Sequence, residues 1–262
     1  MATQHTLSLQ GKQIFVAGSS RGIGAEIAKA LAAQGGSVVL GYASRKDAAL
    51  EVVASIKKET PSAQVEVVGG DLSSAAGAHS IAKDILAKTG GSLDILVLTS
   101  GFSEMKDLSH LTQESWDKHM NTNITGPIFL VQALLPSIRA DGRIIFFSTS
   151  LCAHPAAIGP GYLPYVASKG CLEQALRVLA RDPSITGAER RITVNAIAPG
   201  PVNTELFLKG KTPEIVDRIK SLVPRNRIGE VDDIVGPVLY LASPLSKWVN
   251  GQVLRINGGM TT

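Results

Sequence analysis

The segment from Ser148 to Lys169 reads STSLCAHPAAIGPGYLPYVASK and brings hydroxyl, thiol, phenol and ammonium groups together. Tyr165 and Lys169 are four residues apart at the start of a helical stretch, so they share one face, a turn apart. An ammonium group beside a phenol favours the phenolate and lowers the tyrosine pKa from about 10 toward the working pH. The pair therefore predicts a general acid or base, although this spacing also occurs in plain surface pairs.

Tyr162 is the rival phenol in the same segment. Four residues beyond it stands Val166, so Tyr162 has no charged partner on its face and is assigned to packing or substrate contact. His154 fits an exposed loop residue better than a substrate contact. Tyr165 is thus the one phenol of the segment whose pKa a neighbouring charge is expected to lower.

A glycine-rich turn, AGSSRGIG, follows the first expected strand and opens a helix. Free backbone N–H groups and the positive end of the helix dipole meet there, which favours an anion. Gly22 lets the backbone approach a pyrophosphate, and Gly24 lets the helix pack close to the strand. The spacing is GxxxGxG, and a purely structural turn is the alternative.

The end of the second expected strand discriminates between dinucleotides, because an acid there binds the ribose of NAD and a basic residue accepts the 2′-phosphate of NADP. The sequence reads VVLGYASRK, with no acid before Asp47. Ser44 and Arg45 stand at this position, and Arg21 lies in the glycine turn. A guanidinium donates two parallel hydrogen bonds to phosphate, so the sequence predicts NADP(H). The alternative is that Arg45 and Lys46 only start a solvated helix.

Short Val, Ile and Leu runs alternate with amphipathic stretches, which predicts βα units around a parallel sheet buried on both faces. Seven strands are expected, at Gln13–Ala17, Ser37–Tyr42, Gln64–Gly69, Leu93–Leu98, Arg143–Phe147, Arg191–Ala198 and Gln252–Ile256. Helical spacing covers Gly24–Gln34, Arg45–Glu59, Ala75–Lys88, Asn123–Arg139, Tyr165–Ala180 and Val231–Leu241.

Residues 203–229 interrupt this alternation and include FLKGKTPEIVDRIKSLVPRNRIG. An insertion of this kind often forms a mobile lid over a site, and the alternative is a surface excursion without a role.

The chain of 262 residues suits one α/β domain, and its net charge of +4 comes without a run of Lys and Arg, which argues against a nucleic-acid surface. The 2 cysteines lack metal-type spacing, so we expect no disulfide framework and no metal site. The N-terminus lacks a signal-peptide core and no window approaches the ~18 apolar residues of a membrane span. We expect a cytoplasmic protein without a membrane or nucleic-acid partner.

From about Leu9 to Gly259 the chain resembles the short-chain dehydrogenase/reductase family. VAGSSRGIG is similar to its cofactor turn, GGDLS to its adenine-contacting segment and LDILVLTSG to its fourth strand. NTNITG resembles the segment of its helix asparagine, YVASK its catalytic pair, and APGPVNT its nicotinamide-side turn. VNAIAPGPVNTELF and WVNGQVLRINGG lean toward trihydroxynaphthalene-reductase-like and 3-oxoacyl-thioester-reductase-like members.

The pattern and the resemblance together imply a single-domain Rossmann-type three-layer α/β sandwich over residues 1–262. The resemblance implies that Tyr165 is the acid or base, that Lys169 also holds the nicotinamide ribose, and that Asn123 supports a water-linked proton path. A buried structural amide is the alternative for Asn123. The implied cofactor contacts are Gly18, Ser20, Arg21, Gly22, Ile23, Gly24, Tyr42, Ser44, Arg45, Asp71, Leu72, Ser100, Gly101, Tyr165, Lys169, Pro199, Gly200, Val202 and Thr204.

Two ways of counting residues locate the hydroxyl that orients the substrate carbonyl, and they give different residues. The family commonly has a serine 13 residues before the tyrosine, which lands on Cys152, and a thiol is a poor donor. Counting along the strand GRIIFFST gives Thr149 instead. Strand register fixes side-chain direction while loops accept insertions, so Thr149 is preferred and Ser150 is the reserve. The loop would then be about three residues longer than usual, within AHPAAIGPG.

Two departures from the family pattern matter. Ala17 stands where the family has Thr, and Leu98 to Gly101 replace Asn-Asn-Ala-Gly, so hydrogen bonds near the cofactor are lost unless Thr99 and Ser100 supply hydroxyls. The expected function is an NADPH-dependent ketoreductase. The alternatives are an NAD-dependent alcohol dehydrogenase of this family and a dinucleotide-binding regulator without turnover.

The resemblance also implies a homotetramer or homodimer, paired through the helices of Asn123 and Tyr165. The apolar loop Pro155–Pro164 and the pair Leu206 and Phe207 suggest a small-molecule ketone that is apolar or cyclic.

Overall fold

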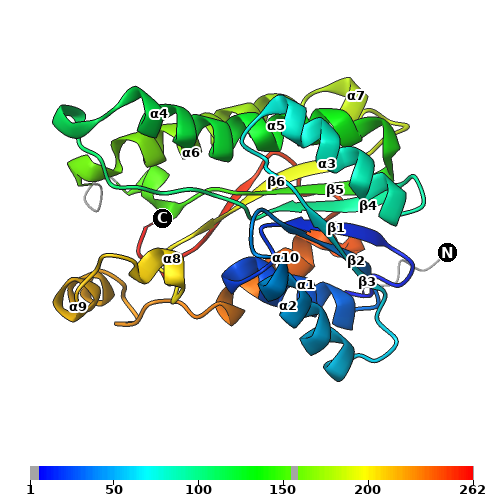
Figure 1. The fold of residues 1–262 in the computed structure, drawn as a ribbon, viewed down its shortest axis with the longest axis horizontal. Helices are drawn as coiled ribbons and strands as arrows, with labels where there is room; N and C mark the ends of the chain where they lie inside the picture. Colours follow the sequence, from blue (N-terminus) through cyan, green and yellow to red (C-terminus); the bar gives the residue numbers. More distant parts are fainter. Residues whose placement is uncertain (1–5, 155–158, 262) are drawn as a thin grey trace.

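The computed structural model describes residues 6–154 and 159–261, and a seven-stranded parallel sheet lies at its centre (Figure 1). The strand order is β3-β2-β1-β4-β5-β6-β7. The strands are β1 (Gln13–Ala17), β2 (Ser37–Tyr42), β3 (Val65–Gly69), β4 (Leu93–Leu98), β5 (Ile138–Phe147), β6 (Thr193–Pro199) and β7 (Val253–Ile256). The predicted parallel α/β sandwich is confirmed.

Helices cover both faces of the sheet (Figure 1). One face carries α1 (Gly22–Ala33), α2 (Lys46–Glu59) and α10 (Asp232–Ala242). The other carries α3 (Ala75–Lys88), α5 (Gly126–Leu134) and α6 (Leu163–Leu179), with α4 (Gln113–Met120) and α7 (Pro183–Thr186) on the same side. Two short helices, α8 (Glu205–Leu208) and α9 (Pro213–Ser221), lie beyond the end of β6. None of the helices in these described ranges is long and apolar enough to cross a membrane.

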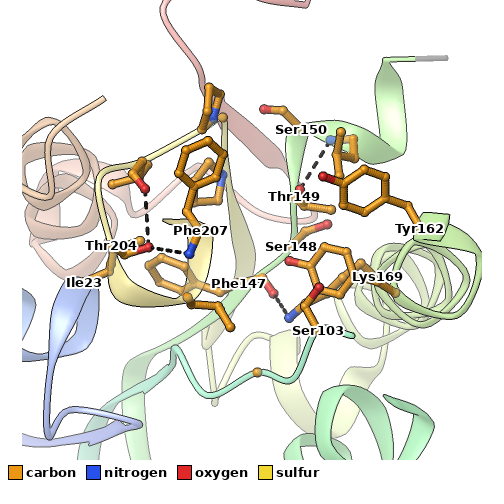
Figure 2. A pocket seen from close by; sticks show the side chains of 18 of the residues that line it. Ile23, Ser103, Phe147, Ser148, Thr149, Ser150, Tyr162, Lys169, Thr204 and Phe207 are labelled. Carbon is orange, nitrogen blue, oxygen red and sulfur yellow. Dashed lines mark hydrogen bonds between the residues drawn. The ribbon is translucent and has the colours of Figure 1, made fainter. Parts of the chain in front are cut away.

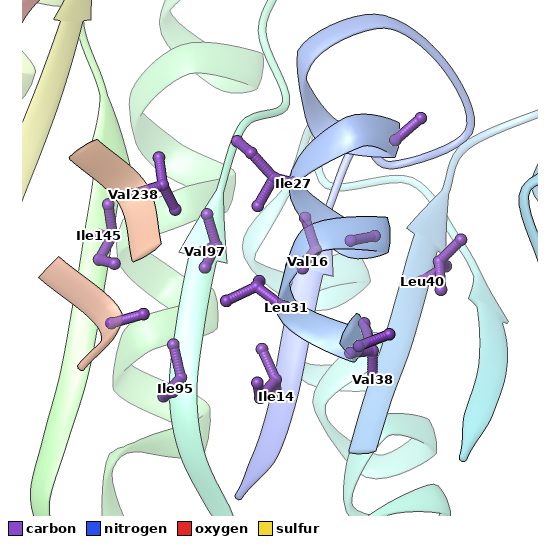
Figure 3. Close-up of a cluster of buried hydrophobic side chains, with 14 of the residues drawn as sticks. Ile14, Val16, Ile27, Leu31, Val38, Leu40, Ile95, Val97, Ile145 and Val238 are labelled. Atoms are coloured by element: carbon purple, nitrogen blue, oxygen red, sulfur yellow. The ribbon is translucent and has the colours of Figure 1, made fainter. Parts of the chain in front are cut away.

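Alternate residues of each central strand enter two separate hydrophobic cores. On β1, Ile14 and Val16 pack with Leu31 of α1, as Figure 3 shows, whereas Phe15 packs on the opposite face. Because both faces are covered, a strand such as β4 is buried at all six positions. This double burial explains why the strands are near-continuous apolar runs.

The predicted strand bounds hold to within one or two residues, except in β5. Arg191, predicted to begin β6, has φ 49°, a left-handed conformation that a strand does not accept. Its guanidinium instead pairs with Asp141 at 2.8 Å. β5 begins at Ile138, where it pairs with Leu93, and its register then shifts before it pairs again at Arg143.

The helix predicted at Asn123–Arg139 is wrong at both ends. A π-helical turn over Asn121–Thr125 joins α4 to α5, so the helical path begins ten residues earlier, at Gln113. The path ends at Leu134 because Pro136 lacks the N–H that the next turn requires. The remaining predicted helices agree with the structure to within two residues.

The insertion of residues 203–229 folds into two capped helices. Thr204 accepts a hydrogen bond from the N–H of Phe207 at the start of α8, and Thr212 accepts one from the N–H of Ile215 at the start of α9. Glu205 of α8 reaches back to the glycine turn, where its carboxylate lies 3.2 Å from the Arg21 guanidinium. The insertion therefore contacts the element that follows β1.

Candidate active site

A cavity lies at the carboxyl ends of the strands, beside the point where the chain order reverses between β1 and β4. In an open parallel sheet the loops after these two strands diverge to opposite faces and leave a crevice. The cavity has a volume of about 260 Å³, and residues after β1, β4, β5 and β6, together with α6 and the insertion, form its wall. Figure 2 shows part of this wall.

The glycine turn adopts backbone conformations that favour glycine. Gly18 has φ 72° and Gly22 has φ 56°. A Cβ atom at Gly24 would lie 2.4 Å from the carbonyl oxygen of Gly18, so a side chain there would displace the turn. The first turn of α1 has no side-chain cap, and its backbone N–H groups are thus free to bind an anion.

The altered motif after β4 does supply one hydroxyl to the turn. Thr99 Oγ1 donates to the carbonyl oxygen of Ala17 over 2.6 Å, which ties β4 to the end of β1. Ser100 Oγ is buried and has no hydrogen-bond partner among the described residues. A buried hydroxyl without a partner costs free energy unless a ligand satisfies it. Together with the open turn, this atom fits a bound dinucleotide.

The residues predicted to choose between NADP and NAD lie outside the cavity, at the ends of β2 and α1. Arg21 pairs with Glu205, and Arg45 pairs with Asp47 at 3.5 Å. Both guanidinium groups are more than half exposed, so these ion pairs are weak. Ser44 is also exposed next to Arg45. A phosphate with two negative charges can compete for either arginine.

The residues predicted to contact adenine lie in the same region. The Asp71 carboxylate accepts bonds from the N–H and the hydroxyl of Ser73, at 2.8 and 2.6 Å. The ring of Tyr42 lies against Gly69, where an added Cβ would come within 2.6 Å of it. Leu72 presents its carbonyl oxygen to α5 at Gly126. These contacts hold the ends of β2 and β3 next to each other.

Tyr165 and Thr149 meet at the cavity wall. The Thr149 hydroxyl lies near the Tyr165 phenol and lowers its pKa. Ser150 is turned away, since its hydroxyl donates to the carbonyl oxygen of Ala198 at 2.9 Å and accepts from Asn257 at 3.2 Å. Of the two hydroxyls left open by the sequence, Thr149 is therefore the one beside the phenol.

The prediction that Lys169 lowers the pKa of Tyr165 is wrong for this structure. Burial raises the pKa of Tyr165 to about 12, and only the Thr149 hydroxyl works against that rise. The ammonium of Lys169 is bonded elsewhere, because it donates to the carbonyl oxygen of Phe147 over 2.7 Å, as Figure 2 shows. The phenol is consequently protonated at neutral pH.

Lys169 is itself 4% exposed and has no carboxylate within ion-pair distance among the described residues. Burial lowers its pKa to about 8. An alanine Cβ at Gly101 would lie 3.5 Å from Lys169 Nζ and 3.5 Å from Asn123 Oδ1. The segment after β4 therefore passes directly over both side chains. Lys169 is thus a buried cation at the floor of the cavity.

The side chain of Asn123 agrees with the structural alternative. Its Oδ1 accepts from the N–H of Phe102 at 2.8 Å, and its Nδ2 donates to the carbonyl oxygen of Phe102 and to Ser168 Oγ, each at 2.9 Å. Both amide hydrogens are therefore used. Buried His119 supports the same segment by accepting from the N–H of Glu104 at 3.1 Å. The Asn123 side chain therefore has no free hydrogen to donate to a water molecule, and the proton path stays a prediction.

The turn after β6 forms the wall opposite Tyr162 (Figure 2). Thr204 Oγ1 donates to the carbonyl oxygen of Val202 at 3.3 Å while it caps α8. Gly200 lies so close to Asn257 that an added Cβ would come within 2.8 Å of its Cα. Close packing thus sets the path of this turn.

The structure brings about half of the predicted site residues to one cavity. Those that line it are Ile23, Gly101, Thr149, Ser150, Tyr165, Lys169, Pro199, Gly200, Val202 and Thr204. The others lie in the glycine turn, at the ends of β2, β3 and β4, or in the π-helical turn. Pro155–Ile158 of the loop expected to be lengthened lie outside the described residues.

Several lining residues were not predicted. They are Ser103, Phe147, Ser148, Leu151, Pro201, Lys211, Ile219, Leu222 and Met260. Ile215, Ile219 and Leu222 have the spacing of an apolar helix face, and this pattern could have predicted that α9 packs against the site. The sequence holds no comparable signal for Lys211, one of several lysines in the insertion.

Comparison with known proteins places this arrangement among enzymes. A family model described as "Enoyl-(Acyl carrier protein) reductase" matches residues 17–261. A "Short-chain type dehydrogenase/reductase" of Picea abies is 35% identical over 96% of this chain and 93% of its own length. An NADPH-dependent aldehyde reductase-like chloroplastic protein of Arabidopsis thaliana is 34% identical over 98% and 97%. A hydroxynaphthalene reductase-like protein of Metarhizium majus is 34% identical over 97% of each chain.

Solved structures agree over nearly the whole length. A short-chain dehydrogenase/reductase from Serratia marcescens has a TM-score of 0.88 at 33% identity and covers 97% of this chain and 99% of its own. A short chain dehydrogenase from Burkholderia cenocepacia, solved in complex with NADP, has a TM-score of 0.87 at 31% identity with the same coverage, 97% and 99%. Both likenesses extend through the sheet and the loops that line the cavity.

Proposed function

Since this chain belongs to the short-chain dehydrogenase/reductase family, we propose that it is an NADPH-dependent reductase that converts a carbonyl group to a secondary alcohol. The observation that carries the proposal is the meeting of the Tyr165 phenol and the Thr149 hydroxyl at the cavity wall, above buried Lys169. When bound, NADPH supplies the hydride.

In this proposal Tyr165 gives its proton to the carbonyl oxygen and Thr149 orients that oxygen with a second hydrogen bond. The Tyr165 phenol, whose pKa burial raises to about 12, is protonated at neutral pH, as an acid in the reduction must be. Alcohol oxidation needs the phenolate as base. We expect the rate of oxidation to rise toward high pH and the rate of reduction to fall there.

Lys169 is proposed to hold the nicotinamide ribose, with its ammonium fixed by the carbonyl oxygen of Phe147. The glycine turn and the first N–H groups of α1 are proposed to bind the pyrophosphate, and Ser100 to satisfy its buried hydroxyl there. Arg21 and Arg45 are proposed to bind the 2′-phosphate. The NADPH-dependent relative and the NADP complex support this choice of cofactor.

The substrate is proposed to be an apolar or cyclic ketone. The cavity wall carries large apolar side chains, which favour a ring or chain of carbon atoms: Leu151, Leu206, Phe207, Ile219, Leu222 and Met260. The hydroxynaphthalene reductase-like relative supports a ring-bearing substrate. We propose residues 203–229 as the lid over it.

The cytoplasm is the proposed place of action, and a homotetramer or homodimer the proposed assembly. The helices of Asn123 and Tyr165 are the proposed interface. Light scattering that gives only a monomer would refute the assembly.

The deciding experiment follows NADPH oxidation on a panel of aromatic and cyclic ketones. We expect Tyr165→Phe to lower kcat by about 10³-fold, within the usual effect of losing a general acid, while the Kd of NADPH changes little. NADH at equal concentration should be a poor donor. Equal rates for Tyr165→Phe and the parent would refute the mechanism, and a preference for NADH would refute the cofactor assignment.

A further inference from the structure

Lys211 is a partly buried cation at the cavity wall that has no acidic partner. It lies between α8 and α9 and lines the same cavity as Tyr165 and Thr149. Its ammonium donates to the carbonyl oxygen of Phe207 and lies 4.7 Å from the centre of the Phe207 ring. Among the described residues no carboxylate comes within ion-pair distance of it.

Other cations of the insertion either have an acidic partner or are exposed to water, unlike Lys211. Lys220 pairs with Asp217 at 2.8 Å, and Arg227 pairs with Asp233 at 2.6 Å. Lys211 therefore bears a positive charge toward the cavity that no side chain of the insertion neutralises. Burial lowers the pKa of Lys211, which is the sign of a cation deprived of water without a compensating anion.

The surroundings of Lys211 define what a partner must look like. Leu206, Phe207, Ile219 and Leu222 line the cavity with it. A lysine ammonium has three hydrogens, and the Phe207 carbonyl accepts one. Two donors are left for a ligand. In Figure 2, Phe207 projects from the side of the cavity opposite Tyr162 and Lys169. A ligand that reaches from the Tyr165 phenol to Lys211 would contact apolar side chains along its length and a cation at its end.

We propose that Lys211 binds an anionic group of the substrate, so that the substrate is an apolar ketone bearing a carboxylate away from its carbonyl. This inference rests on the proposed function and narrows its substrate class. A carboxylate in this position gains charge-assisted hydrogen bonds with the partly buried ammonium. A neutral ester of the same shape gains none of them.

The test compares matched acids and esters: 3-acetylbenzoate, 4-acetylbenzoate and 5-oxohexanoate, each against its methyl ester, with NADPH. We expect the parent to show at least a tenfold higher kcat/KM for one acid than for its ester. Lys211→Met keeps an apolar stem against Phe207 but loses the charge, so it should remove that preference and leave the ester unchanged within about twofold. Lys209→Met, an exposed lysine of the same insertion, is the matched control and should change neither value.

The outcomes separate this inference from the proposed function. If esters and acids are reduced equally by the parent, or if Lys211→Met keeps the preference, the inference is wrong while the reductase stands. If Lys211→Met instead weakens binding of NADPH, measured by its fluorescence, and leaves the acid-to-ester ratio unchanged, Lys211 serves the cofactor diphosphate and the inference is wrong. If no compound is reduced, the proposed function fails, and calorimetric binding of the same acids and esters to the NADP-loaded protein decides the role of Lys211.

Discussion

The hydroxyl of Ser148 donates a hydrogen bond of 2.7 Å to the carboxylate of Glu173, and this contact joins the end of β5 to the middle of α6. Both side chains are buried. Thr149 follows Ser148 in the chain, and Glu173 lies one helical turn beyond Lys169. The contact therefore sets how the hydroxyl on the loop after β5 lies against the phenol and the ammonium on α6.

Replacement of Glu173 tests this connection. Glu173→Leu leaves the buried Ser148 hydroxyl without its acceptor, and we expect the free energy of unfolding to fall by about 2 kcal/mol, with kcat lowered as Thr149 loses its position. Glu173→Gln keeps an oxygen acceptor and should recover most of both losses. Urea denaturation and steady-state kinetics measure the two effects. Equal losses in the two variants would show that the hydrogen bond is not what matters.

The buried ammonium of Lys169 gives stability a defined dependence on pH. Its pKa in the folded protein, about 8, lies below the ordinary value of 10.5, so between these values the unfolded chain binds more protons. Stability contributed by this group therefore rises with pH in that window. Relative to Lys169→Met, the parent should gain about 2 kcal/mol between pH 7 and pH 10.

Denaturant unfolding of both proteins at several pH values measures this difference. Tyr165 and Cys152 also have raised pKa values and reduce the stability of both proteins at high pH. A difference between parent and variant that stays constant with pH would contradict a lowered Lys169 pKa.

The two helical glycines Gly24 and Gly236 should respond differently to replacement by alanine. At Gly24 the new Cβ would lie 2.4 Å from the Gly18 carbonyl oxygen and 2.6 Å from Thr99 Oγ1. We expect Gly24→Ala to cost about 2 kcal/mol of stability and to weaken NADPH binding. At Gly236 in α10 no described atom outside its own helix and its chain neighbours lies within 4 Å. Pro237 follows and restricts the helical conformation of a residue with a Cβ, but alanine has a helix propensity about 1 kcal/mol better than glycine, so Gly236→Ala should change stability by less than about 1 kcal/mol. Thermal unfolding with and without NADPH checks both, and similar losses would refute the steric argument.

The thiol of Cys152 should react slowly with alkylating reagents, although it lies near the candidate active site. Burial raises its pKa from 9.0 to about 11, and nearby Glu173 adds to the rise. In a Cys171→Ser variant, the rate of iodoacetamide labelling should increase about tenfold per pH unit between pH 8 and pH 10, as the thiolate fraction does. Mass spectrometry follows the modification, with unfolded protein as the control. A rate that levels off near pH 9 would mean an ordinary thiol.

The sheet could be predicted because it depends on local pattern. Strands buried on both faces must be apolar runs, and β1, β2 and β4 begin and end where the sequence indicates. The predicted bounds of β6 and of the helix that contains α5 were wrong because a single residue determines where each element begins or ends. Arg191 has a left-handed backbone beside Asp141, and Pro136 ends α5, neither of which periodicity reports.

The candidate site was predicted as a set of positions but not as an electrostatic arrangement. Sequence spacing places Tyr165 and Lys169 on one helix face, yet the partner of the ammonium is the carbonyl oxygen of Phe147, supplied by β5. Likewise, the choice between Thr149 and Ser150 depends on the carbonyl oxygen of Ala198 in β6. Such partners come from distant strands, so spacing within one segment cannot reveal them.

The hydrogen bond from Thr99 to the carbonyl oxygen of Ala17 joins residues 82 positions apart, and it has a consequence for the order of folding. β1 and β2 follow each other closely along the chain, whereas β4 must close a long loop before it pairs with β1. The glycine turn packs against Thr99, so it acquires its shape only after that late step. We therefore expect that during synthesis the anion-binding turn takes its final shape only after Thr99 has left the ribosome.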